Sequence, residues 1–415
     1  MKRPAASPAI SGGDSVLTVD EALATIIGAA AKPFVEKRNV ETANGFVVAR
    51  DIASKINHPP FRASAMDGYA VRFSDAEVGA KLLVVGEAAA GAPFAGAVGA
   101  GEAVRIFTGG VVPEGADHVA IQEEVTRDGD VITIDEVQKN PSNIREAAVD
   151  FREGEILRSK GDRLVAMDLA LLASANIAEI DVFQKPLIAY FDNGDELREP
   201  GSNLRPGEIV GSNRFALDAM IAEWGGVPKY LGRAEDDLAA IGGKFREGKT
   251  ADILVTVGGA SVGDRDYVRS VFAAEGGELA FPKIAVRPGK PTWFGRIGNT
   301  RVLGLPGNPA SAIVCAILFL RPLVKATGGE RFTKQIVRAA LAASLGPNGP
   351  RETYLRGRVR PDDNGRLIAE AAHNQDSSLL SPLAAGNCLI RRFAHAPAAA
   401  EGELADCLVY GNIGA

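Results

Sequence analysis

Cysteine and histidine are scarce in this chain, which contains three cysteines and four histidines among 415 residues. The cysteines, Cys315, Cys388 and Cys407, are an odd and widely separated set, which does not suggest a disulfide framework. The chain also lacks a CxxC or CxxxC pair and its histidines are scattered, so no structural zinc site is expected. Sparse, unpaired cysteines are typical of a reducing compartment, and we therefore expect a cytoplasmic protein.

Long apolar segments and a strong positive charge are missing as well. The longest fully apolar run, about residues 312–320, has half of the roughly 20 residues that a membrane-spanning helix needs. Residues 1–15 lack the apolar stretch of a secretory signal and are expected to form a disordered tail. The formal net charge of -6 argues against binding to nucleic acid, so an anionic substrate would need a local positive pocket.

Two segments with helical patterns lie before and after a β-rich region in the first part of the chain. Thr18 and Glu21 have the spacing of a capping box, which predicts a helix over about residues 16–31. Residues 46–54 are expected to extend that helix, and residues 151–184 show a helical pattern again. We assign these flanks to one helical linking domain.

The order of the remaining patterns predicts an α/β multidomain protein. Short β-favouring runs and turns such as Asp128-Gly129 indicate a β domain inserted between the helical flanks. Farther on, strands alternate with helices, one of them expected to begin at Ser212 and to end at Gly225-Gly226, which predicts a doubly wound, mostly parallel α/β domain. The expected parts are a tail (1–15), a helical linking domain (16–58 and 142–185), an inserted β domain (59–141), an α/β domain (186–332) and a C-terminal β domain (333–415).

Three loops at the expected carboxyl ends of the parallel strands carry polar residues, and ligands of such sheets bind at that edge. The first loop contains three carboxylates, Asp192, Asp195 and Glu196, after a buried strand. Carboxylates that lie close together repel one another unless a cation or protons intervene. The loop therefore indicates either a Mg²⁺ or nucleotide-ribose site or a solvated turn.

The second loop is rich in glycine. Gly258, Gly259 and Gly263 follow a buried strand and would let backbone N–H groups converge on a phosphate, to which Ser261 adds a hydroxyl donor. Asp264 and Asp266 are candidates to hold a metal that bridges phosphates. A tight turn between a strand and a helix explains the same glycines equally well.

The third group of loops is basic. Lys283, Arg287 and Lys290 supply positive charge that an acidic chain otherwise lacks, and Asn308 with Pro309 has the pattern of a helix start. The partial positive charge of such a helix start favours an anion by about 0.3–1 kcal/mol. The alternative interpretation is a basic turn on the surface.

Together with a segment nearer the N-terminus, these loops resemble the molybdopterin molybdenumtransferase family, which is related to the C-terminal part of gephyrin. SAMDGYAV with LPGNP is highly specific for the family, whereas GDEL is shared with related pterin-adenylylating domains. The matching motifs occur in the family's order across residues 17 to about 410: SAMDGYAV (64–71), RIFTGG (105–110), GDEL (194–197), GGxSxGxxD (258–266), PGKP (288–291) and LPGNPxSA (305–312).

The resemblance implies an elongated four-domain subunit and a homodimer. The pterin-binding domain of one subunit would face the inserted β domain of the other, so that the active site is shared. The implied reaction joins molybdate to adenylylated molybdopterin, giving the molybdenum cofactor and AMP, with Mg²⁺ as cofactor. The expected protein partners are a molybdopterin adenylyltransferase and recipient molybdoenzymes.

The resemblance also assigns roles to residues of this sequence. The family's catalytic positions match Asp67, Thr108, Glu196, Asp236, Asp266, Lys283 and Arg287. Glu196 and Asp266 are the expected metal ligands, and Asp237 matches the position of Asp236 equally well. The expected substrate-binding residues are Gly194, Asp195, Gly258, Gly259, Ser261, Gly263, Lys290, Pro306, Gly307 and Asn308.

The chain departs from the family pattern at three places. Asp192-Asn193 replaces the usual hydroxyl pair before GDEL, and Ala260 replaces the usual valine. Arg287 replaces the usual lysine, which keeps the charge but not its geometry. These departures bear on how the substrate is bound rather than on the fold.

Two other functions fit parts of the pattern. A molybdopterin adenylyltransferase shares the pterin-binding domain but does not need the β domain that carries SAMDGYAV. A non-catalytic scaffold, or a paralogue of the same fold that has lost its activity, would release no AMP.

Overall fold

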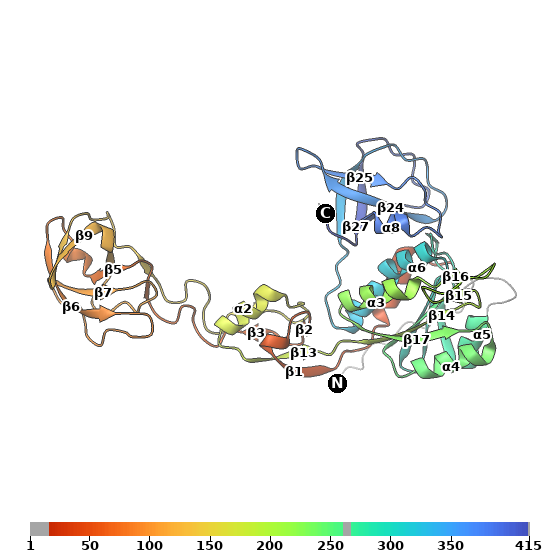
Figure 1. Ribbon diagram of the computed structural model, residues 1–415, viewed down its shortest axis with the longest axis horizontal. Coiled ribbons are helices and arrows are strands. Elements are labelled where there is room, and N and C mark those ends of the chain that lie inside the picture. The colour runs from red at the N-terminus through yellow and green to blue at the C-terminus, as the bar shows by residue number, and fades with distance from the viewer. Residues whose placement is uncertain (1–15, 260–266, 414–415) are drawn as a thin grey trace, which may run out of the picture. The chain divides into compact units, whose positions relative to one another are not determined.

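The computed structural model describes residues 16–259 and 267–413 of the chain (Figure 1). The chain divides into two compact units. The smaller unit is Lys37–Val182, and the larger unit joins Met1–Glu36 to Phe183–Ala415. The smaller unit is therefore an insertion in the sequence of the larger one.

A six-stranded sheet forms the main part of the smaller unit. Its neighbouring strands are antiparallel except for one parallel pair, β6 and β7. Side chains alternate between its faces, so Tyr69 and Val71 pack in one apolar cluster and Ala70 in another. In order across the sheet the strands are β8 (His118–Ile121), β5 (Gly68–Val71), β7 (Glu102–Ile106), β6 (Lys81–Ala88), β10 (Val131–Ile134) and β9 (Val125–Asp128).

The rest of the smaller unit contains less helix than the sequence suggested. It has one described α-helix, α2 (Ala166–Ser174), and the 3₁₀ turns η1 (Val40–Thr42), η2 (Phe73–Asp75) and η3 (Gln122–Glu124). The short strands are β1 (Val35–Asn39), β13 (Glu179–Phe183) and β2 (Val47–Val48) in one sheet, β12 (Ile156–Arg158) with β3 (Ile52–Ala53), and β11 (Ile144–Arg145) with β4 (Ala63–Ser64).

The expected helix over residues 46–54 is wrong, because these residues form β2 and β3. Val48 and Ile52 are β-branched, which favours extended backbone, and both are buried in the core beside α2. The expected helix over residues 151–184 is limited to α2. Gly154 and Gly161 have φ of +82° and +89°, a conformation that a right-handed helix does not contain.

The core of the larger unit is a mixed sheet between two layers of helices (Figure 1). The first four strands are parallel and the last two are antiparallel to their neighbours, which confirms the predicted doubly wound, mostly parallel domain. In sheet order they are β17 (Val227–Ala234), β14 (Leu187–Asn193), β18 (Ile253–Val257), β22 (Thr300–Leu305), β21 (Trp293–Ile297) and β19 (Gly277–Phe281).

Helices cover both faces of this sheet because its strands are apolar on both sides. Ile188 and Tyr190 of β14 pack with the helices of one face, and Ala189 and Phe191 with those of the other. α1 (Val19–Gly28), whose predicted capping box by Thr18 is confirmed, joins the first group. α3 (Asn213–Glu223) also lies on the first face, and α4 (Leu238–Gly248) and α5 (Tyr267–Ala274) lie on the second.

The longest apolar helix lies inside this core. It runs continuously over Pro309–Thr327 as α6 (Pro309–Cys315), the π-helical segment η4 (Ala316–Leu320) and α7 (Arg321–Thr327). Among the described residues it is the one helix long and apolar enough to cross a membrane, but 83% of its apolar window is buried. Burial against the sheet therefore accounts for its composition.

A small β-barrel ends the chain. β24 pairs with both β25 and β26, which closes the ring β24-β25-β23-β27-β26. The elements are β20 (Val286–Arg287), β23 (Ile336–Leu341), β24 (Glu352–Pro361), β25 (Leu367–Ala371), α8 (Ser381–Ala384), β26 (Cys388–Arg392) and β27 (Leu404–Val409). Cys388 and Cys407 are buried in the barrel, and all three cysteines are free thiols.

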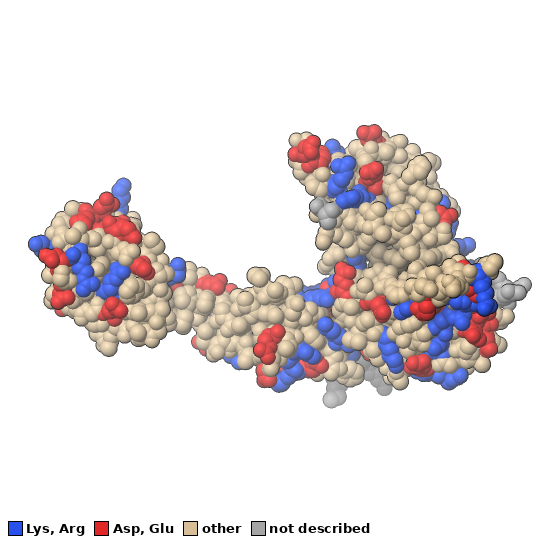
Figure 2. Space-filling view, in the orientation of Figure 1, with Lys and Arg blue, Asp and Glu red and all other residues tan. Residues whose placement is uncertain are grey.

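Charged side chains of both signs are interspersed on the face of the molecule that Figure 2 shows. That face has no broad area of positive charge, in keeping with the net charge of -6.

Candidate active site

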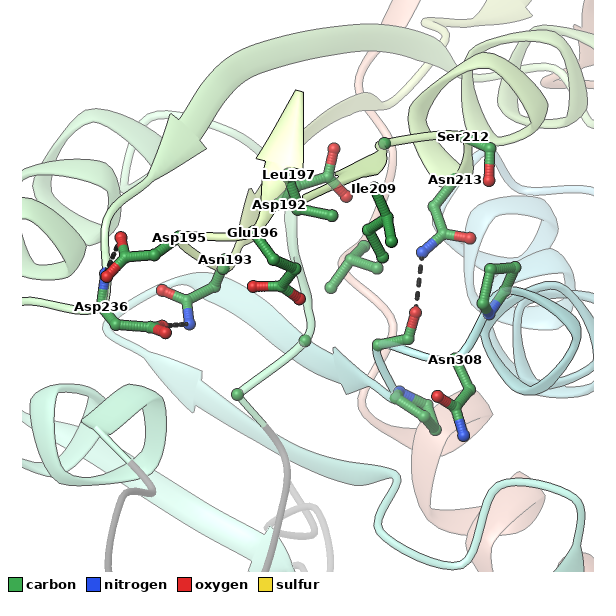
Figure 3. A pocket seen from close by; sticks show the side chains of 18 of the residues that line it. Asp192, Asn193, Asp195, Glu196, Leu197, Ile209, Ser212, Asn213, Asp236 and Asn308 are labelled. Carbon is green, nitrogen blue, oxygen red and sulfur yellow. Dashed lines mark hydrogen bonds between the residues drawn. The ribbon is translucent and has the colours of Figure 1, made fainter. Parts of the chain in front are cut away.

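A cavity of about 730 Å³ opens at the carboxyl ends of β14, β18 and β22 in the larger unit (Figure 3). Its size is that of a typical ligand site, about 300–1,000 Å³. Of the predicted residues, the described lining brings together Gly194, Asp195, Glu196, Asp236, Gly258, Gly259, Pro306, Gly307 and Asn308. Three loops that are far apart in sequence thus meet at the edge where ligands of such sheets bind.

The end of β14 places two adjacent side chains on opposite faces of the sheet. Asp192 lies on the side of Tyr190, and Asn193 lies on the side of α4 and α5. The turn that follows depends on Gly194, whose φ is +153°. A Cβ there would lie 2.6 Å from the carboxylate of Glu196, so the glycine lets Glu196 fold back over the turn.

The structure separates Asp236 from Asp237, which the sequence did not. Asp237 is the N-cap of α4, and its carboxylate accepts hydrogen bonds from the N–H groups of Ala239 and Ala240. Asp236 lines the cavity, where its Oδ1 accepts a hydrogen bond from Asn193 Nδ2 at 2.6 Å. Asp237 therefore stabilises the start of α4, whereas Asp236 presents its carboxylate to the cavity.

The glycine-rich loop begins with two residues that the backbone itself requires. Gly258 and Gly259 have φ of +94° and +64°. A Cβ on Gly258 would lie 2.6 Å from the carbonyl oxygen of Asn193, and one on Gly259 would lie 2.3 Å from Val268. Close packing of the loop therefore explains both glycines. The predicted Ser261, Gly263 and Asp266 lie outside the described residues.

The Pro306–Asn308 loop faces the glycine-rich loop across the cavity. A Cβ on Gly307 would lie 3.3 Å from the Cα of Gly258, so the two loops approach each other closely. Asn213 Nδ2 donates a hydrogen bond to the Gly307 carbonyl at 3.1 Å. Asn308 precedes α6 as predicted, but its side-chain amide donates to Ser377 Oγ instead of capping the helix.

Sequence reasoning missed several residues of the lining. Asn213, Ile209, Val210 and Tyr267 border the cavity, as does Asn193, which was noted only as a departure from the family pattern. Ser212 is the N-cap position of α3 as predicted, but it makes no side-chain capping bond. The position of Asn213 at the start of a helix was the one sequence signal that could have indicated a ligand-binding residue. Ile209 and Val210 form β16 (Ile209–Val210), which pairs with β15 (Leu197–Arg198). No sequence pattern indicated these two residues.

The predicted basic residues do not belong to the described lining. Lys283 is half-buried, Arg287 and Lys290 are exposed, and Pro291 is the part of this loop that borders the cavity. The described lining instead contains four carboxylates, Asp192, Asp195, Glu196 and Asp236, and no lysine or arginine. A phosphate group in this cavity would therefore meet negative charge from the described side chains.

Asp67 and Thr108 lie together in the smaller unit. Asp67 Oδ1 accepts hydrogen bonds from both the backbone N–H and the hydroxyl of Thr108, each at 2.8 Å. These two bonds stabilise the ionised carboxylate and lower the pKa of Asp67 below its usual value. The carboxylate is thus held ionised in a fixed orientation at the start of β5.

Asp192 borders a second cavity of about 300 Å³ beside the first. Its carboxylate is buried and accepts a hydrogen bond from the Tyr230 hydroxyl at 3.2 Å. Burial raises the pKa of Asp192 to about 6, although the Tyr230 bond and the charge of Arg214 oppose the shift. Arg214 is itself paired with Glu199 at 2.5 Å. Asp192 is therefore mostly ionised at neutral pH and takes up a proton as the pH falls through about 6.

No cluster of three or more histidine, cysteine, aspartate or glutamate side chains suited to a metal ion occurs among the described residues. Of the two predicted metal ligands, Glu196 lines the cavity and Asp266 lies outside the described part of the chain. The carboxylate oxygens present are nevertheless the ligand type that Mg²⁺ prefers.

Three family models match the chain in order. They are the MoeA N-terminal region (domain I and II) over residues 17–176, a probable molybdopterin binding domain over residues 193–326 and the MoeA C-terminal region (domain IV) over residues 338–410. The second of these contains most of the cavity lining. Fold and site together define a multidomain protein of the molybdopterin-binding class.

Relatives extend the match along the chain. A molybdopterin molybdenumtransferase of Haemophilus influenzae is 35% identical over 380 residues, covering 90% of this chain and 94% of the relative. One from Nostoc is 34% identical and covers 84% and 82%. A crystal structure of the molybdopterin biosynthesis MoeA protein from Pyrococcus horikoshii is 27% identical, with a TM-score of 0.81 over 95% of this chain and 100% of that chain. The chain belongs to the MoeA family, the molybdopterin molybdenumtransferases.

Proposed function

We propose that this chain inserts molybdate into adenylylated molybdopterin and releases AMP, forming the molybdenum cofactor. The observation that carries the proposal is the cavity at the carboxyl ends of β14, β18 and β22, where the GDEL, glycine-rich and LPGNP loops converge. Its volume of about 730 Å³ suits a nucleotide-sized ligand, and its loops belong to the region matched by the molybdopterin-binding model.

The proposed reaction requires a cation in this cavity. Breaking the phosphoanhydride of the adenylylated pterin moves negative charge onto AMP, whereas the described lining is itself negative. Glu196, together with Asp266, would hold the Mg²⁺. The ion would supply Lewis-acid stabilisation of the phosphate charge.

The chain's own groups would bind and orient the rest of the substrate. The backbones of Gly258 and Gly307 approach each other closely without side chains between them, and their N–H groups are the donors proposed for a phosphate at this edge of the cavity. Lys283, Arg287 and Lys290 are proposed to attract molybdate, a dianion that needs fixed positive charge. Asp236 would present its carboxylate to the cavity from the fixed position that Asn193 gives it.

The proposed active site is shared between two subunits of a homodimer. Asp67 and Thr108 of one subunit would complete the cavity of the partner subunit. The proposal is supported by the fixed, ionised Asp67 carboxylate and by the family resemblance. A molybdopterin adenylyltransferase would deliver the substrate, cytoplasmic molybdoenzymes would receive the product, and no membrane or nucleic acid would take part.

The test combines the purified protein with adenylylated molybdopterin, Mg²⁺ and molybdate, and follows AMP and the cofactor together. We expect equimolar AMP and cofactor, with neither product in the presence of a chelator. A mixture without molybdate is the control for simple hydrolysis. An adenylyltransferase would instead consume ATP and molybdopterin, and a scaffold would release no AMP, so either result contradicts the proposal.

A further inference from the structure

Asn193 joins the end of β14 to the segment that precedes α4. Its Nδ2 donates to Asp236 Oδ1 at 2.6 Å, and the two residues are 43 positions apart in the sequence (Figure 3). Asp195 Oδ1 holds the other end of the same residue by accepting a hydrogen bond from the Asp236 backbone N–H at 3.2 Å. The backbone and the carboxylate of Asp236 are therefore both fixed by the loop that carries GDEL.

Asn193 and Asp236, the two partners of this hydrogen bond, differ in how far they are buried. Asn193 is only 8% exposed, and its backbone lies between β17 and the glycine-rich loop. A Cβ on Gly259 would lie 3.2 Å from its amide nitrogen, so the glycine leaves free the space that the Asn193 side chain uses. Asp236 is exposed at the rim of the cavity. A buried donor thus holds an exposed carboxylate that would otherwise sample several rotamers.

The chemistry of an asparagine suits this task. A lysine or arginine would hold the carboxylate but would also neutralise it, and an aspartate would repel it. A serine or threonine, the usual family residue, has its donor one bond closer to the backbone and would fall short of Asp236. The neutral amide fixes the carboxylate and leaves its full negative charge facing the cavity.

We propose that Asn193 is a positioning residue for the reaction, acting through Asp236. The inference rests on the proposed function, because it assigns Asp236 to the cavity in which the adenylylated pterin would react. In this chain, the replacement of the family's hydroxyl by Asn193 is then part of the active-site geometry rather than a neutral change.

The first experiment removes the donor. Asn193→Ala is expected to lower kcat for AMP release at least tenfold while the KM for adenylylated molybdopterin stays within about threefold. Asn387→Ala is the matched control, since Asn387 is 7% exposed and uses its amide to hold Val359 and Asn412 in the distant barrel. That variant is expected to lower the melting temperature and to leave kcat unchanged. A wild-type kcat in Asn193→Ala overturns the inference.

The second experiment exchanges the two side chains. Asn193→Asp alone places two carboxylates at hydrogen-bond distance and is expected to lower both melting temperature and kcat at neutral pH. The double variant Asn193→Asp with Asp236→Asn restores an amide–carboxylate bond with the donor reversed. We expect its melting temperature to return to within a few degrees of wild type and its kcat to remain at least tenfold lower, because the carboxylate has moved.

The outcomes separate the inference from the proposed function. Recovery of both melting temperature and kcat in the double variant would show a merely structural pair and overturn the inference. Recovery of neither would show that the contact does not hold the loops together, which also overturns it. If the wild-type protein releases no AMP, the proposed function fails and takes the inference with it. If the wild type is active and Asn193→Ala equals it, only the inference fails.

Discussion

Asp67 and Thr108, which are 41 positions apart in the sequence, meet through two hydrogen bonds to a single carboxylate oxygen, Asp67 Oδ1. Both residues were singled out from separate motifs, SAMDGYAV and RIFTGG. Pairing of β5 with β7 brings them together, since Gly68 lies opposite Ile106 in that register. Thr108 of the RIFTGG motif therefore holds the carboxylate that Asp67 of the SAMDGYAV motif supplies.

We expect Asp67→Ala to keep its fold and to lose most AMP release, because β5 pairs with β7 and β8 through backbone bonds that do not involve this carboxylate. Thr108→Val should lose less activity, since the backbone N–H bond to Asp67 remains. Melting temperature and turnover are measured on the same samples. Glu77→Ala, which removes an exposed carboxylate of this domain, is the control, and wild-type turnover in Asp67→Ala would refute the role.

A shared active site predicts complementation between inactive variants. Asp67→Ala and Glu196→Ala are each expected to be inactive alone. After subunit exchange, a heterodimer contains one site with both defects and one with neither, so activity should return to about a quarter of the wild-type value in an equal mixture. Exchange is verified by mass spectrometry of the assembled protein. A monomeric wild-type protein by light scattering, or inactivity after verified exchange, would rule out the shared site.

Asp192 predicts a pH-dependent stability. Its pKa is about 6 in the folded protein, above the 3.8 usual for an aspartate. The folded state therefore binds this proton more tightly than the unfolded state, and stability falls as pH rises from about 4 to about 6. Above that range the cost of the buried charge is constant, on the order of 2–3 kcal/mol. Asp192→Asn removes this cost and keeps the shape of the side chain.

The melting temperature of Asp192→Asn is therefore expected to exceed that of the wild type at pH 8 and to converge with it near pH 4. Tyr230, Arg214 and Glu199 face Asp192 in both proteins and are unchanged by the substitution. Asp363→Asn, at an exposed position of the barrel, should show no such trend. A difference between Asp192→Asn and the wild type that is the same at every pH would contradict the pKa shift.

Replacing Gly259 by alanine is expected to lower the free energy of unfolding for two reasons, backbone strain and a steric contact. Gly259→Ala is expected to cost about 1 kcal/mol for positive φ and about 1–3 kcal/mol more for the contact with Val268. Gly276→Ala is the control, because Gly276 has φ of +82° with open space around it and should show the first cost alone. Equal unfolding free energies for the two variants, measured in denaturant, would remove the packing argument.

Gly307 is the better test of phosphate binding. It does not have positive φ, and a Cβ there meets only the Cα of Gly258 at 3.3 Å, so Gly307→Ala should keep its fold after a shift of a few tenths of an ångström between the two loops. Because the methyl group would stand between the two loops, we expect adenylylated molybdopterin to bind at least tenfold more weakly, about 1.4 kcal/mol. Calorimetry measures both affinities. Unchanged affinity would place the phosphate elsewhere.

Local patterns predicted what short-range physics controls. The capping box of Thr18 and Glu21, the Asp128-Gly129 hairpin and the alternation of strands and helices after residue 186 all occur in the structure. The prediction was wrong over residues 46–54, where a helical spacing of apolar residues was also compatible with short strands. Burial of Val48 and Ile52 in a common core decided between the two.

The sequence by itself determined the family, the order of the loops and the residues that carry charge and conformational freedom, because these reside in motifs a few residues long. Only the tertiary structure decided which side chains meet: that Asp236 faces the cavity while Asp237 caps α4, that Asn193 and Asp192 point to opposite faces, and that Lys283, Arg287 and Lys290 are not part of the described lining. Such pairings depend on the register between strands and on how loops pack, and both arise from contacts between segments far apart in the chain.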